Sequence, residues 1–132
     1  MNPRLSLALD FLKVKFPFEV EGAFITYEDN DCKIEAYPSQ IGRIPSLSKE
    51  SEKDLSINQL VKIVGYLTGK KLILGRDEPS IWDSNHRKLI YLRLHIPSGV
   101  LQLEYQDGEE TASYDEYLSD LIRSTWTVDE GN

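Results

Sequence analysis

The chain has 132 residues, of which 40% are hydrophobic and 28% are charged, and its formal net charge is -7. This length suits one domain, residues 1–132, with a core of its own, and the composition excludes a disordered or fibrous chain. No apolar run reaches the roughly 18 residues that a membrane span needs, and the single cysteine, Cys32, predicts a reducing, cytoplasmic location.

The charge is distributed unevenly along the chain. Residues 1–103 contain 14 basic and 13 acidic residues, whereas residues 104–132 contain nine acidic residues and one basic residue. A field of one sign repels phosphate backbones and attracts basic surfaces. We therefore expect no direct binding to nucleic acid and no contact with a membrane, and we favour a basic protein as the partner.

The N-terminal segment has the pattern of a helix that is apolar on two sides. Asn2 can cap this helix and Pro3 suits its first position. One stripe should face the core: Leu5, Ala8, Leu9, Leu12 and Phe16. A second stripe lies on roughly the opposite side: Leu7, Phe11 and Val14. The second stripe is expected to pack either against another part of the chain or, at the surface, against a second copy of the chain or another partner protein.

Residues 18–38 read as two strands joined by the acidic turn EDND, because Asn and Asp tolerate left-handed backbone. Gly22 marks a bulge that shifts the alternation of apolar residues in the first strand. Residues 38–54, with two prolines and a run of Ser, Lys and Glu, are predicted to form an exposed, mobile connection.

A buried helix should follow at residues 57–68, since Ser56 and Gln59 form a capping box and the apolar residues cover most of its surface. Gly69 is placed to end this helix with left-handed backbone, and KKLILG then reads as a short strand. The structure of residues 76–88 is predicted to be a polar loop held to the core by an apolar pair.

Residues 89–105 alternate between apolar and polar side chains and contain the turn PSG, which predicts a hairpin. The alternation predicts three facing pairs: Leu94 with Leu101, Leu92 with Leu103, and Ile90 with Tyr105. On the outward side, Arg93 is expected to pair with Glu104.

A last helix is predicted from Ser113, which forms a capping box with Glu116, and residues 127–132 read as a frayed tail. The resulting order is α-β-β-α-β-β-β-α, with about five strands and three helices. We therefore expect a single α+β domain, with a mainly antiparallel sheet and the helices gathered on one face.

The segment RDEPSIWDSNHRK holds the densest set of candidate catalytic groups. A base, a nucleophile and an orienting acid are all present: His86, Ser80 or Ser84, and Asp77 or Asp83. The tight glycine turn that usually presents a nucleophile is missing, and the histidines and the cysteine do not have metal-ligand spacing. The sequence therefore predicts neither an enzyme nor a need for a metal or cofactor.

The charge pattern favours a non-enzymatic binding protein that docks on a basic partner, as an immunity protein, an inhibitor or an antitoxin does. The acids would steer the encounter and an exposed tryptophan would contribute affinity. The expected partner-binding residues are Glu109, Glu110, Asp115, Glu116, Asp120 and Trp126.

Two alternatives belong to other classes. In size, charge and element order the chain resembles type III secretion chaperones, and this resemblance implies a homodimer that uses the Leu7, Phe11 and Val14 stripe. The other alternative is a small enzyme or ligand-binding protein built around residues 76–88, with His86 and Asp83 as working groups.

Overall fold

The computed structural model describes residues 3–13, 15–38, 52–76 and 80–113. In this part of the chain the helices are α1 (Pro3–Lys13) and α2 (Ile57–Thr68). The strands are β1 (Val20–Glu28), β2 (Asp31–Pro38), β3 (Glu52–Asp54), β4 (Leu72–Leu74), β5 (Ile81–Asp83), β6 (Leu89–Ile96), β7 (Val100–Tyr105) and β8 (Gly108–Ser113).

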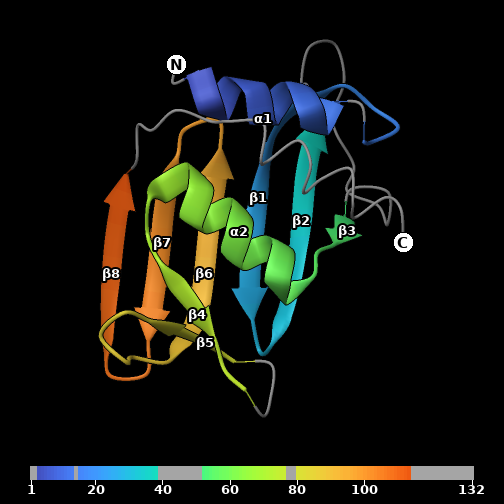
Figure 1. Ribbon diagram of the computed structural model, residues 1–132. Coiled ribbons are helices and arrows are strands. Elements are labelled where there is room, and N and C mark those ends of the chain that lie inside the picture. The colour runs from blue at the N-terminus through green and yellow to red at the C-terminus, as the bar shows by residue number, and fades with distance from the viewer. Residues whose placement is uncertain (1–2, 14, 39–51, 77–79, 114–132) are drawn as a thin grey trace.

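The main sheet has six strands in the order β3-β2-β1-β6-β7-β8, and every neighbouring pair is antiparallel. Strands β4 and β5 form a separate two-stranded ribbon. Figure 1 shows both helices on the same face of the sheet, with α1 across one end of the strands and α2 running obliquely over them. The expected α+β class with a mainly antiparallel sheet is therefore confirmed.

Helix α1 covers the sheet with the predicted apolar stripe. Leu5, Ala8, Leu9 and Leu12 are all buried, and Phe16, just beyond the helix, is buried as well. Each fully buried leucine of this kind stabilises the fold by about 2 kcal/mol. The side chains of Leu7 and Phe11, and all of Val14, lie outside the described residues.

The core lies between the helices and one face of the sheet, because alternate residues of each central strand point toward the helices. On β1 these are Ala23, Ile25 and Tyr27, which are at most 1% exposed. The predicted bulge is confirmed by a register shift between Val20 and Gly22. The predicted acidic turn is confirmed too, since Asp29 and Asn30 both have positive φ.

Helix α2 begins and ends as its sequence predicts. The Ser56 side chain accepts a hydrogen bond from the Gln59 backbone N–H, and the Gln59 side chain returns to the Ser56 backbone. At the other end Gly69 has φ 72° and donates its N–H to the Gly65 carbonyl. This helix packs on β2 and on β4, the strand that follows it.

The β6–β7 hairpin confirms most of the predicted register. Leu94 faces Leu101 and Leu92 faces Leu103, but Tyr105 faces Leu89 in place of Ile90. An irregularity between Leu89 and Tyr91 inserts one residue, so Ile90 turns outward and is 46% exposed. The prediction that Ile90 faces the core is therefore wrong.

Three further expectations need correction. Residues 108–113, which were not predicted to be a strand, form β8, which ends at Ser113. Residues 52–54 of the predicted connection form β3, and residues 81–83 of the predicted loop form β5. The described strands therefore exceed the expected five, and the third predicted helix lies outside the described residues beyond Ser113.

Candidate partner-binding face

One face of the six-stranded sheet is covered by neither helix, and we call it the open face. Strand alternation turns a second set of side chains toward it, opposite to the core residues. From β2 to β8 they include Lys33, Glu35, Phe24, Thr26, Tyr91, Arg93, Gln102, Glu104, Glu109 and Thr111. These side chains range from half-buried to exposed, which is the pattern of an antiparallel sheet that faces solvent on one side.

Aromatic and cationic side chains are stacked in an ordered group at one end of the open face. The guanidinium of Arg93 lies over the Phe24 ring, 4.0 Å from its centroid. The rings of Phe24 and His95 are 4.7 Å apart, and Tyr37 stacks on His95 with an interplanar angle of 3°. Contacts of this kind fix the side chains in place and provide a flat, partly apolar surface.

His95 is hydrogen-bonded on both sides of its ring. Its Nε2 lies 2.7 Å from the Tyr37 hydroxyl and its Nδ1 lies 2.6 Å from the Ser98 hydroxyl. A neutral imidazole has one donor and one acceptor nitrogen, so both contacts suit the neutral ring. Burial and the neighbouring positive charge of Arg93 lower the pKa of His95 below its usual range.

The contact between Tyr37 and His95 depends on a glycine in β1. A Cβ atom added to Gly22 would lie only 2.1 Å from the Tyr37 hydroxyl oxygen. The bulge at Gly22 therefore leaves the space into which the Tyr37 side chain reaches.

Acidic residues outnumber basic residues among the described side chains of the open face. The basic ones are Lys33 and Arg93, and the acidic ones are Glu28, Asp31, Glu35, Glu52, Asp54, Glu104 and Glu109. Lys33 is already paired, with its Nζ 3.3 Å from a Glu35 oxygen and 3.5 Å from a Glu52 oxygen. Hydrogen bonding to Glu35 and the charge of Glu52 raise the pKa of Lys33.

A facing pair of acidic residues lies at the β7–β8 end of the open face, where Glu104 is half-buried and Glu109 is exposed. Glu104 and Glu109 are directly opposite each other in the antiparallel ladder. Facing carboxylates in a ladder destabilise a sheet, and within the described residues neither one has an ion-pair partner.

A hollow of about 370 Å³ lies in the open face, next to the stacked side chains of Phe24 and Arg93. Its lining includes Phe24, Thr26 and Tyr91, acidic residues of β1, β2 and the turn between them, and the basic residues Lys33 and Arg93. This size suits one long side chain or a small ligand.

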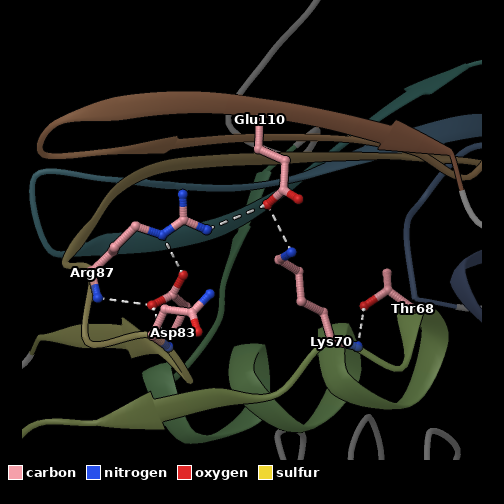
Figure 2. Close-up of polar contacts among 6 residues, drawn as sticks. Thr68, Lys70, Asp83, Arg87 and Glu110 are labelled. Carbon is pink, nitrogen blue, oxygen red and sulfur yellow. Dashed lines mark hydrogen bonds and ion pairs between the residues drawn. The ribbon is translucent and has the colours of Figure 1, made fainter.

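The predicted partner-binding residues are not all on this face. Glu109 is exposed on it. Glu110 points to the opposite side, where its carboxylate lies 2.7 Å from Lys70 Nζ and 3.9 Å from Arg87 Nη2 (Figure 2). The other predicted residues, Asp115, Glu116, Asp120 and Trp126, lie outside the described residues.

The expected pairing of Arg93 with Glu104 is wrong. Arg93 faces Gln102 in the ladder and Tyr91 faces Glu104. Because the Arg93 guanidinium lies over Phe24 on the neighbouring strand β1, Glu104 is left without this cation. Sequence alternation correctly turns Tyr91, Arg93 and His95 outward, but it gives no sign that Phe24 and Tyr37 join them from other strands.

The loop at residues 76–88 is organised by Asp83. Its carboxylate accepts hydrogen bonds from the backbone N–H and the Nε of Arg87, at 2.8 and 2.7 Å (Figure 2). It also accepts one from the backbone N–H of Asn85, at 3.0 Å. Burial by itself would raise the pKa of the Asp83 carboxyl, but these hydrogen bonds and the charge of Arg87 bring it below its usual range.

The candidate catalytic groups of this loop that the structure describes are not assembled as a triad, and Asp77 lies outside the described residues. Ser80 Oγ accepts a hydrogen bond from Trp82 Nε1, and the exposed His86 has φ 62°. His86 contacts Asp83 through its backbone N–H, which donates to the Asp83 carbonyl. Asp83 and Arg87 therefore serve to close the loop, and Arg87 also stacks over the Tyr105 ring at 4.0 Å.

No group of three or more His, Cys, Asp or Glu side chains in the described ranges is arranged to hold a metal ion. Neither helix in the described part of the chain is long and apolar enough to cross a bilayer. Comparison of the chain with protein-family models, curated proteins and solved structures finds no match.

Proposed function

We propose that the protein is a non-enzymatic acidic binding protein that docks on a basic protein, in the manner of an immunity protein, an inhibitor or an antitoxin. One observation carries the proposal: carboxylates on the open face, such as those of the half-buried Glu104 and the exposed Glu109, are brought together without an ion-pair partner among the described residues. A basic partner would relieve this repulsion when it binds.

The electrostatics of the whole chain support the same reading. The net charge is -7, and the excess of acid is concentrated after residue 103. Such a field accelerates association with a basic surface at low salt and weakens as salt screens it. It also disfavours ligands that carry phosphate groups.

The test is affinity capture of the tagged protein from a lysate of its own host, at low and at moderate salt. Wild type should retain one basic protein in stoichiometric amount, with less retained at moderate salt. The double variant Glu109→Lys with Asp120→Lys should weaken this retention, because it reverses two charges in the acidic segment.

A matched control reverses two acidic residues elsewhere, Asp10→Lys and Glu19→Lys, and gives the same net charge. This control should retain the partner as wild type does, if the acidic segment is what attracts it. A captured partner that is not basic, or one whose affinity at low salt is unchanged by reversing Glu109 and Asp120, would contradict the proposal.

A further inference from the structure

We propose that the basic partner docks across the open face of the sheet, over β1, β6, β7 and β8, with its arginine or lysine side chains against Glu104 and Glu109 and in the neighbouring hollow. This inference rests on the proposed function. It adds the surface that makes the contact, which charge alone does not identify.

The described elements leave the open face of the sheet uncovered. Both helices lie on the other side of the sheet, as Figure 1 shows. The β4–β5 ribbon lies on that side too, because Arg87, which follows β5, stacks over the ring of the core residue Tyr105. The open face nevertheless carries aromatic and apolar side chains as well as polar ones. Phe24, Tyr91 and His95 are half-buried, and Val100 is 42% exposed. Ordered rings beside polar side chains are typical of binding surfaces.

The open face is complementary in charge to a basic partner. The basic side chains of the face are already engaged, Lys33 with Glu35 and Glu52, and Arg93 with the Phe24 ring. The facing pair Glu104 and Glu109 has no such internal cation among the described residues. A cation from a partner would therefore meet carboxylates that no described side chain neutralises, and it would remove their mutual repulsion.

The positions of the acidic pair and the hollow restrict the kind of partner that can bind both. The acidic pair and the hollow belong to neighbouring strands, since Tyr91 of the hollow faces Glu104 directly. A partner that spans both positions needs at least two cations on one surface. The long side chain of arginine suits the hollow, because its planar guanidinium can stack on aromatic rings while it pairs with carboxylates. This requirement fits a basic protein segment better than a single small amine.

The test uses a synthetic octa-arginine peptide as the probe and the full chain labelled with ¹⁵N. In a titration at low salt, the largest amide shifts should fall on the strands of the open face, including Tyr91, Arg93 and Gln102. The variant Glu104→Gln with Glu109→Gln should bind the peptide about 2- to 30-fold more weakly, the range expected for the loss of two exposed ion pairs.

The matched control is Asp10→Asn with Asp107→Asn, which removes the same charge from α1 and from the β7–β8 turn. It should retain more of the affinity than the Glu104 and Glu109 variant does. The amide spectrum of each variant also shows whether it is folded.

The outcomes separate the two proposals. Saturable binding with shifts confined to the helices or to residues beyond 113, or equal weakening by the two variants, would overturn the docking surface and leave the proposed function standing. No saturable binding at low salt would contradict the proposed function itself.

Discussion

At the scale of single residues, Asp83 is the side chain on which a whole loop depends. It is 3% exposed and accepts hydrogen bonds from Asn85 and Arg87. Replacing it with alanine leaves two backbone N–H groups and a guanidinium without this acceptor. We expect Asp83→Ala to lower the free energy of unfolding by about 2 to 4 kcal/mol at pH 7, as measured by urea denaturation.

The same residue should make stability depend on pH. Its folded-state pKa lies below its value in the unfolded chain, which is near 4. The contribution of Asp83 to stability is therefore fully present above about pH 4, and it is lost as the pH falls through the folded-state pKa. Asp83→Asn should not show this part of the acid destabilisation, whereas the exposed control Asp107→Asn should keep it. If wild type and Asp83→Asn lost stability equally in acid, this role would be wrong.

At the scale of elements, the bulge at Gly22 in β1 leaves room for the contact between Tyr37 and His95. In Gly22→Ala the new Cβ would overlap the Tyr37 hydroxyl, so Tyr37 must move away from His95. We expect a loss of stability of about 1 to 3 kcal/mol, the usual effect of overpacking. We also expect the pKa of His95 to rise toward its ordinary value, because its ring becomes less buried.

Gly108→Ala is the matched control for this prediction. No heavy atom lies within 4 Å of a Cβ added there. Its stability should therefore change by only about 0.5 kcal/mol or less. NMR titration of the His95 ring and urea denaturation measure both effects. An unchanged pKa and stability in Gly22→Ala would show that Tyr37 does not depend on the glycine.

The elements that sequence could predict are those with a strong period or a cap. Helix α2 has both, with the capping box at Ser56 and the left-handed Gly69. Strand β8 has neither. Its residues GEETAS carry no apolar alternation, because one side faces solvent and the other meets the charged pair Lys70 and Arg87. Its strand conformation comes from pairing with β7, which is a tertiary effect.

At the scale of the whole molecule, some features of the open face could be predicted from the sequence and others could not. The excess of acid and the outward position of Tyr91 and Arg93 follow from composition and from a period of two. The meeting of Glu104 with Glu109, and of Phe24 with Arg93, depends on which strands become neighbours. Sequence alternation assigns a side chain to a face but does not decide its cross-strand partner, so the acidic pair became visible only in the sheet.

This arrangement predicts how the stability of the whole molecule should respond to salt. Raising the salt concentration from about 0.1 M to about 1 M shortens the screening length from roughly 10 Å to roughly 3 Å. Screening should weaken the repulsion between Glu104 and Glu109 and raise the free energy of unfolding of wild type. The variant Glu104→Gln with Glu109→Gln should start about 0.2 to 1 kcal/mol more stable and gain less from added salt.

Urea denaturation at the two salt concentrations measures both quantities, and Asp10→Asn with Asp107→Asn serves as the charge-matched control. The control removes a carboxylate that pairs with Lys13, since Asp10 lies 3.7 Å from the Lys13 ammonium, so it should not begin more stable than wild type. If all three proteins gained equally from salt, the repulsion would belong to the net charge of the chain as a whole. A smaller gain in the Glu104 and Glu109 variant alone would place it on the open face, where a basic partner would relieve it.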